Sequence, residues 1–122
     1  MGNNGRTVSF SIGEMIFEYD EEKNQINIKK HHVSFKVAAR VFFDHNRIEL
    51  FDEDNSVFED RFDVIGNAAI GVTGITDDIL FVVYTDRIRQ IVHGVETDVT
   101  RIISARYATE FERGLYYGKL ND

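Results

Sequence analysis

The sequence ILFVVYT at residues 79–85 most constrains how this chain folds. Its residues are aliphatic, aromatic or β-branched, and such residues favour strands. No charged residue interrupts the run, which is typical of a strand buried on both faces of a sheet. Because 122 residues is the length of one ordinary domain, the other segments must supply the layers that cover this strand.

Two helices are predicted before this strand. Asp20 is a suitable N-cap for a helix over residues 21–30, because its carboxylate can accept from the free N–H groups of the first turn. The acidic first turn and the basic last turn of that segment also suit the helix dipole. Ser34 caps a second, more amphipathic helix, whose apolar residues recur at helical spacing: Phe35, Ala38, Ala39, Phe42 and Phe43.

Three further strands are predicted from alternating apolar and polar residues, at 47–51, 58–65 and 100–106. A weaker alternation at residues 15–19 precedes the first helix. Helices followed by sequential strands and a last helix predict an α+β fold. We expect two N-terminal helices, a mainly antiparallel sheet of about four strands, and a C-terminal helix.

The ends of the chain and one connection complete this prediction. Residues 1–14 carry Gly and Asn without periodicity and are expected to form a flexible leader, while residues 15–122 form a single domain. Turn-forming residues within 88–99 predict a long hairpin tip. The last helix is expected at residues 108–119, with a packing face made of Phe111, Leu115, Tyr116 and Tyr117.

The composition excludes several kinds of site. Cysteine is absent, which removes disulfides, thiolate zinc sites and cysteine nucleophiles and suits a reducing cytoplasm. The longest uncharged run, residues 64–76, is interrupted by glycines and polar residues and is too short to span a membrane. The 14 basic and 21 acidic side chains give a net charge of −7, yet residues 23–40 hold five cations and no acid. That segment could attract a polyanion although the whole chain repels one.

No phosphate-loop, dinucleotide-binding or zinc-peptidase pattern is present. The adjacent His31 and His32 point in different directions at a helix end, so they make a poor pair of ligands and no metal site is predicted. Each cation near the end of a predicted element also has a structural explanation, as a complement to a helix dipole or as a partner for a nearby acid. The candidates are Lys30, His31, Arg61, Arg106, and Arg113 with Glu112 beside it.

Five segments occur in an order and at intervals typical of one protein family. They are FEYDEEKNQINIKKHHVSF (17–35), AARVFFD (38–44), DRFDVIG (60–66), LFVVYT (80–85) and RIISARYATEFERGLYY (101–117). Together they resemble the BrnT family, the toxin half of a type II toxin–antitoxin pair in the RelE/ParE-like superfamily. His32 stands where this family usually has glycine, so the first helix is expected to end without a left-handed residue. Tyr107 occupies a position that is often basic.

The resemblance implies a RelE-like fold and a small endoribonuclease of the mRNA-interferase type that uses no metal and no cofactor. Metal-free RNA cleavage requires a base for the 2′-OH proton, an acid for the departing 5′-oxygen, and cations around the phosphorane. The residues expected at the site are Arg61 and Arg106 for the charge, His31 and Glu112 for proton transfer, and Lys30 and Arg113 for RNA binding.

The same resemblance implies a BrnA-like antitoxin as partner, with DNA contacted only through that antitoxin. A homodimer or a toxin–antitoxin heterotetramer is compatible with this pairing. The protein is expected in the cytoplasm, with RNA as its substrate and no membrane contact. Two alternatives remain open. One is a toxin fold with a decayed site that acts only as a protein-binding module, which the net charge and Tyr107 favour. The other is a free-standing domain whose acidic stretch, residues 44–63, docks a basic peptide.

Overall fold

The structure is a computed structural model that describes residues 5–70 and 77–120. Its strands are β1 (Thr7–Ile12), β2 (Met15–Asp20), β3 (Ile48–Phe51), β4 (Phe62–Asn67), β5 (Ile79–Val92) and β6 (Val95–Tyr107). Its helices are α1 (Glu21–His31), α2 (Phe35–Ala38) and α3 (Glu110–Leu120), with two short 3₁₀ helices, η1 (Ala39–Phe43) and η2 (Glu53–Asn55). The α+β class is therefore confirmed, although the described part of the chain has six strands rather than about four.

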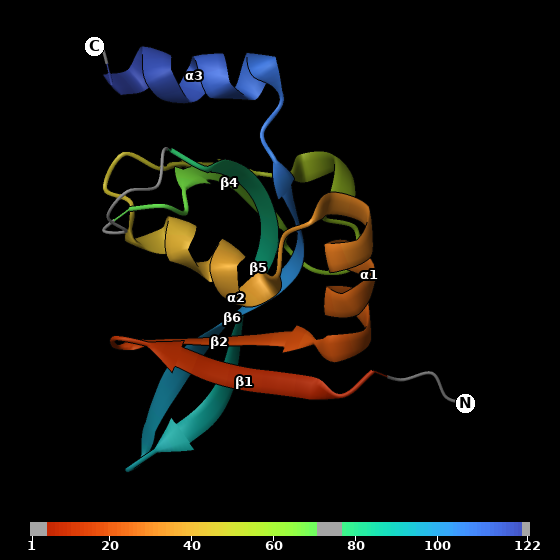
Figure 1. Ribbon diagram of the computed structural model, residues 1–122. Coiled ribbons are helices and arrows are strands. Elements are labelled where there is room, and N and C mark those ends of the chain that lie inside the picture. The colour runs from red at the N-terminus through yellow and green to blue at the C-terminus, as the bar shows by residue number, and fades with distance from the viewer. Residues whose placement is uncertain (1–4, 71–76, 121–122) are drawn as a thin grey trace.

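The six strands form one sheet in the order β1-β2-β6-β5-β4-β3 (Figure 1). Neighbours are antiparallel except β2 and β6, which run parallel where Ile16 lies opposite Val99. The sheet is thus mixed, with β5 and β6 at its centre. No helix within residues 5–70 and 77–120 is long and apolar enough to cross a membrane.

Strand β1 lies within the segment that was expected to be a flexible leader. It pairs with β2 along its whole length, from Thr7 opposite Asp20 to Ile12 opposite Met15. The tight connection passes through Gly13, whose φ of 58° is easily adopted by glycine. The alternating Val8, Phe10 and Ile12 pack against the core, and this period of two is the sequence signal that the expectation missed.

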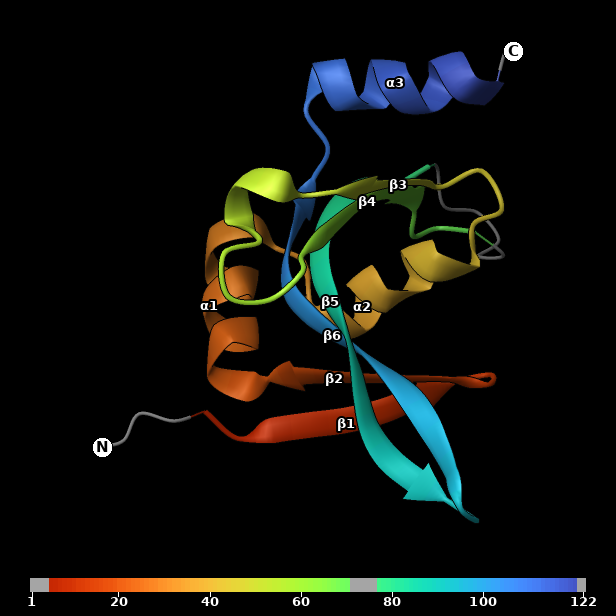
Figure 2. The same ribbon diagram turned by 180° about the vertical axis from the view of Figure 1, so that it is seen from behind.

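The connection between β5 and β6 is much tighter than the long tip predicted at residues 88–99. The strands are 14 and 13 residues long and meet at a two-residue turn, His93-Gly94. Both turn residues have positive φ, 52° and 81°, as the backbone twist of a two-residue hairpin requires. The resulting ribbon reaches to the opposite end of the molecule from α3 (Figure 2).

Helix α1 begins at its predicted residue. The Asp20 side chain accepts from the Lys23 N–H at 3.0 Å, which confirms the N-cap. The expectation that the helix lacks a left-handed residue at its end is wrong. His32 takes φ 61° and ψ 27°, and its N–H donates to the Ile28 carbonyl at 2.9 Å. A side chain in this conformation costs on the order of 1 kcal/mol relative to glycine.

The second predicted helix is only one α-helical turn, α2, which tightens into η1. Ser34 caps it as predicted, with its hydroxyl oxygen accepting from the Val37 N–H at 3.2 Å. The 3₁₀ segment lies close against β4, because a Cβ on Gly66 would meet the Val41 side chain at 2.9 Å. Of the five apolar residues predicted for this segment's core face, four are buried, namely Phe35, Ala38, Ala39 and Phe42, and Phe43 is partly buried.

We call the sheet face that packs on α2 and η1 the inner face and the opposite one the outer face. Aromatic contacts dominate the inner face, among them Phe42 with Tyr84 at a ring-centroid distance of 4.8 Å. A smaller cluster on the outer face joins Ile65 to Tyr116 of α3. Most of the core energy therefore comes from the inner face, which leaves much of the outer face available for charged groups.

Helix α3 lies across one end of the sheet (Figure 1). Tyr116 is buried as predicted, but the other half of the predicted packing face is wrong. Phe111 is 74% exposed and Leu115 is 42% exposed. Because α3 extends beyond the end of the sheet, only one side of the helix has a layer to pack against.

Candidate active site

Arg106 lies near the end of β6, on the outer face, and forms a two-pronged ion pair with Glu112 of α3. Its Nη1 and Nη2 donate to the two Glu112 carboxylate oxygens at 2.7 and 3.0 Å. The guanidinium also lies over the Phe81 ring, 4.3 Å from its centroid. Two fixed contacts therefore hold this cation in one orientation.

Glu112 also belongs to the cap that starts α3. The Thr109 hydroxyl oxygen accepts from the Glu112 N–H at 3.2 Å, and a Glu112 carboxylate oxygen accepts from the Thr109 N–H at 2.8 Å. This reciprocal arrangement is a capping box. The hydrogen bonds from Arg106 and then those from Thr109 hold the pKa of Glu112 below its usual value, against the opposing effect of burial. The carboxylate thus stays ionised and is poorly suited to transfer protons near neutral pH.

A buried carboxylate fixes α3 to the rest of the molecule. Asp44 is fully buried and accepts from the Tyr116 hydroxyl at 2.6 Å and from the Asn67 N–H at 2.8 Å. Burial, followed by the hydrogen bond to Asp44, raises the pKa of Tyr116, so the phenol remains a donor. Since Tyr116 and Glu112 share one helix, this contact also sets where the partner of Arg106 lies.

The Asn27 side chain holds α1 against the edge of β6. The Asn27 amide donates to the Ala105 carbonyl at 2.8 Å and accepts from the Ala105 N–H at 3.2 Å. It therefore satisfies the two backbone groups that a neighbouring strand would otherwise pair. The same amide donates to the Val33 carbonyl at 2.9 Å, which fixes the chain just beyond the helix.

A basic pocket of about 200 Å³ lies between α1 and β6. Ser104 lines this pocket from β6. It precedes Arg106 by two positions in the strand, so the two side chains lie on the same outer face of the sheet. The pocket thus brings the predicted residues Lys30 and His31 to the strand that carries Arg106. It is lined by Lys23, Ile26, Asn27, Lys30, His31, Ile103 and Ser104.

Arg61 lies apart from this site. Its Nε is 3.9 Å from a carboxylate oxygen of Glu59, whose other oxygen pairs with Arg87 at 2.7 Å. Ile65 of β4 and Arg106 of β6 both lie opposite Phe81 of β5. Arg61 precedes Ile65 by four positions, or roughly 13 Å of strand. No contact among the described residues joins Arg61 to Arg106, the two residues that the resemblance assigns to the charge of the phosphorane.

Arg113 also has a separate environment. Its guanidinium lies over the Tyr117 ring at 5.6 Å, and the Tyr117 hydroxyl donates to Asp77 at 3.1 Å. Arg113 is exposed on α3, immediately after Glu112. Arg113 therefore lies outside the cluster of Arg106 and Glu112.

Asp63 is an acid that sequence reasoning missed. It lies on the outer face of β4, and burial together with the nearby Asp52 and Glu112 raises its pKa to about 6, with Arg106 acting in the opposite direction. One of its carboxylate oxygens is buried without a hydrogen-bond partner. The available signal was an acid alternating with Phe62 and Val64 inside a predicted strand. Such a carboxyl can both take and give a proton near neutral pH.

The described residues contain no group of three His, Asp or Glu side chains placed to hold a metal ion. The clearest arrangement is the ion pair of Arg106 with Glu112, with the basic pocket of α1 beside it on β6. Such a surface suits a phosphodiester, and the proton-transfer candidates His31 and Asp63 flank it.

Comparison with known proteins agrees with this chemistry. No curated protein matches the chain. A family model does match residues 19–112, and its description is "Ribonuclease toxin, BrnT, of type II toxin-antitoxin system". The matched region contains Lys30, His31, Arg106 and Glu112. Since it spans most of the 122 residues, this chain belongs to the BrnT family of type II toxin–antitoxin ribonuclease toxins.

Proposed function

We propose that this protein is a metal-independent endoribonuclease, in which the 2′-OH of the RNA substrate is the nucleophile that attacks the scissile phosphate. The observation that carries the proposal is the Arg106 guanidinium, held by both oxygens of Glu112 and bordered by the basic pocket of α1. A fixed cation of this kind stabilises the negative charge that develops on the phosphorane, at no cost of reorganisation during the reaction.

The proton transfers fall to His31 and Asp63. One takes the proton of the 2′-OH as the 2′-oxygen attacks phosphorus, and the other protonates the 5′-oxygen as its bond to phosphorus breaks. The products are a 2′,3′-cyclic phosphate and a 5′-OH. Asp63 suits either step because its pKa is raised to about 6. Its position beside Glu112 and Arg106 supports this role.

The other charged residues position Arg106 or bind the phosphates of the RNA. Glu112 is a positioning residue, because both of its oxygens bind Arg106 and its pKa is lowered. Lys30 binds phosphate within the basic pocket. Arg61 and Arg113 bind RNA phosphates at a greater distance from the scissile bond, which agrees with their separate surroundings.

The reaction chemistry is tested with one short RNA and its analogue with 2′-O-methyl at the scissile nucleotide. The unmodified RNA should be cut equally well with or without EDTA and leave a 2′,3′-cyclic end, whereas the analogue should resist cleavage because its nucleophile is blocked. A matched DNA serves as a second substrate without a 2′-OH. Cleavage of the analogue at the parent rate, or a loss in EDTA that magnesium restores, would refute the metal-free scheme.

The proposal includes growth arrest by the free protein and neutralisation by a BrnA-like antitoxin, through which the complex reaches DNA. Membership of the BrnT family supports a partner of this kind. Co-purification of the chain with the product of a neighbouring gene tests the pairing. Antitoxin binding by a chain that cuts no RNA would instead identify a protein-binding module with a decayed site, which the net charge of −7 favours.

A further inference from the structure

A second pocket, of about 260 Å³, opens on the inner side of the same end of β6. Arg106 and Tyr107 are neighbours in one strand, so their side chains leave it on opposite faces. In the same way His31 lines the basic pocket and His32 lines this one. The two pockets therefore lie on either side of the point where α1 ends beside β6.

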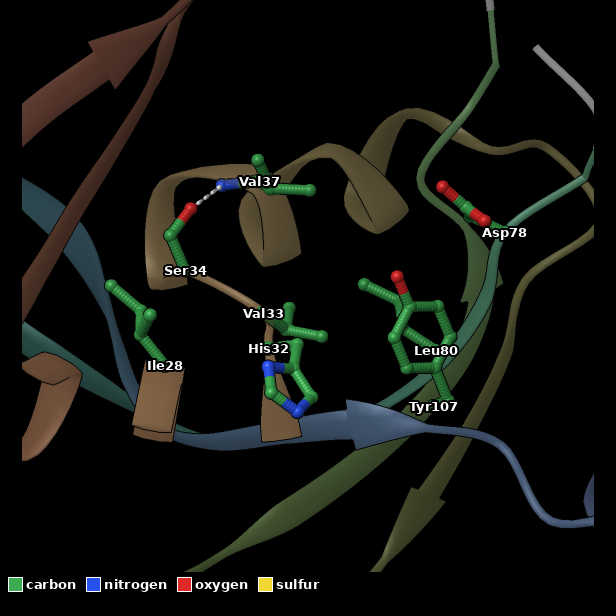
Figure 3. A pocket seen from close by; sticks show the side chains of 8 residues that line it. All are labelled: Ile28, His32, Val33, Ser34, Val37, Asp78, Leu80 and Tyr107. Atoms are coloured by element: carbon green, nitrogen blue, oxygen red, sulfur yellow. Dashed lines mark hydrogen bonds between the residues drawn. The ribbon is translucent and has the colours of Figure 1, made fainter. Parts of the chain in front are cut away.

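The pocket combines an apolar floor with two rings at its mouth. Val33 and Leu80 are buried beneath it. Figure 3 shows the rings of His32 and Tyr107 bordering the same hollow. Tyr107 is 51% exposed, and neither ring makes a ring contact with another described residue. Flat faces that remain open beside an apolar floor are suited to stack against a planar, uncharged group.

His32 holds its place in this pocket at an energetic cost. Its left-handed backbone, φ 61°, is one that glycine adopts without strain. Nothing in its own backbone bonding requires histidine, because the N–H that closes α1 on the Ile28 carbonyl would be present in any residue but proline. A side chain retained in a strained conformation at a pocket wall is a sign of a binding role.

Asp78 supplies the charged group of the pocket. Its backbone is fixed, with the N–H donating to the Asn67 side chain at 3.1 Å and the carbonyl accepting from the Ala68 N–H at 2.9 Å. Its carboxylate makes no hydrogen bond or ion pair with another described residue. Ser34 lies on the opposite wall, where its oxygen accepts from Val37 and its O–H is left to donate. The pocket thus offers one acceptor pair and one donor around an apolar hollow.

We propose that this pocket binds an unpaired guanine base of the RNA substrate, an inference that rests on the proposed ribonuclease function. Guanine presents two parallel donors, N1–H and the N2 amino group, on its Watson–Crick edge, and a carboxylate accepts both at once. No other standard RNA base offers that pair. The rings of His32 and Tyr107 stack on the base while Asp78 reads its edge.

The position of the pocket connects it to the site of cleavage. A base bound beside Tyr107 leaves its phosphate near the end of β6, where Arg106 points to the other side. The chain of the RNA would pass over the junction between α1 and β6, with its phosphates toward Lys30 and Arg106. The pocket would therefore determine the sequence preference of cleavage, because the base that it binds belongs to the nucleotide next to the scissile bond.

Binding of mononucleotides tests this assignment without relying on cleavage. We expect 3′-GMP to bind the full-length protein more tightly than 3′-AMP, 3′-UMP or the inosine analogue 3′-IMP, which lacks the N2 amino group. Asp78→Asn should weaken 3′-GMP binding roughly tenfold to a hundredfold, because a good bidentate contact to a base discriminates by that much. Asp54→Asn makes the same chemical change at an exposed residue of η2 and should leave binding unchanged.

His32→Gly provides a variant whose folding is not in question, because glycine relieves the left-handed strain. It should unfold at a higher temperature than the parent protein and still bind 3′-GMP several-fold more weakly, since it lacks one stacking ring. Unchanged 3′-GMP affinity in both His32→Gly and Asp78→Asn would overturn the proposal.

The remaining outcomes separate the pocket from the proposed function. RNA cleavage by the parent protein that shows no preference for guanine, or a guanine preference that Asp78→Asn keeps unchanged, would remove the pocket assignment and leave the ribonuclease standing. If the parent protein bound 3′-GMP but cut no RNA, and Asp78→Asn lost that binding, the pocket assignment would stand and the ribonuclease function would be refuted. If both variants lost only antitoxin binding, the pocket would belong to a protein partner and the guanine assignment would be wrong.

Discussion

Arg106 and Arg61 lie near strand ends on the same sheet, and each pairs with a glutamate, yet they are held very differently. Arg106 makes two short bonds to Glu112, which is itself fixed by a helix cap, and it stacks on Phe81. Arg61 has one contact of 3.9 Å to Glu59, which Arg87 shares at 2.7 Å. An arginine becomes a fixed charge only when other elements fix its partner.

The largest expected effect comes from removing each arginine in turn. Arg106→Ala should lower the single-turnover cleavage rate on the order of a hundredfold or more, because the charge that faces the phosphorane is lost. Arg61→Ala should lower it by less than about tenfold, as expected for a more distant phosphate contact. Both variants should keep the circular dichroism spectrum of the parent. Equal losses for the two would show that both arginines act at the scissile phosphate and that the contrast drawn here is mistaken.

The two glutamates give a smaller and more specific contrast. Glu112→Gln keeps the shape of the side chain but removes the charge that orients Arg106, so cleavage should fall roughly tenfold. Its weaker cap should also reduce the free energy of unfolding by about 1 kcal/mol. Glu59→Gln, the matched control, should leave the cleavage rate close to that of the parent.

The pH profile separates positioning from proton transfer at Glu112. A positioning residue changes the height of the pH–rate profile, whereas a proton-transfer residue removes one of its limbs. Glu112→Gln should therefore keep the shape of the parent profile. Loss of the acidic limb in this variant would return Glu112 to the proton-transfer role expected from the sequence.

The smallest effect concerns the contribution that Asp63, the acid near Arg106, makes to stability. Burial raises the pKa of Asp63 to about 6, so its neutral form is favoured in the folded state. The stability that this preference contributes is fully present below about pH 4 and is lost as the pH rises through 6. Asp63→Asn should thus be more stable than the parent by about 1–2 kcal/mol at pH 8 and equally stable at pH 4. Urea unfolding at both values measures this, with Asp54→Asn as the control, and a constant difference would contradict the raised pKa.

Sequence reasoning succeeded where the relevant contact is short in sequence. The caps by Asp20 and Ser34 each reach three residues ahead, and both helices start where these residues predict. It failed for Phe111, because helical spacing identifies an apolar stripe but not whether a layer lies beneath it. It also missed β1, since Gly and Asn obscured the alternation of Val8, Phe10 and Ile12.

For the candidate site, too, the sequence predicts local features but not the contacts between distant residues. Charged residues at the ends of elements can be predicted from the sequence, and Lys30, His31, Arg106 and Glu112 were named in this way; their roles stay predictions. The separation of Arg61 from Arg106 could not be predicted, because it depends on the register of three strands. The raised pKa of Asp63 likewise depends on burial and on neighbours from other elements.

The sequence by itself determined the starts of α1 and α2, the buried character of the first half of β5 (residues 79–85), and the family to which the chain belongs. Tertiary structure alone decided which charged residues lie close together. Asn27 meets Ala105 across 78 positions of the chain, and Tyr116 meets Asp44 across 72. These buried polar contacts set where α1 and α3 lie on the sheet, and hence where Glu112 meets Arg106 and where His31 lies beside Ser104 of β6. Local propensity acts over a few residues, whereas such contacts form only after packing has excluded water from the groups that make them.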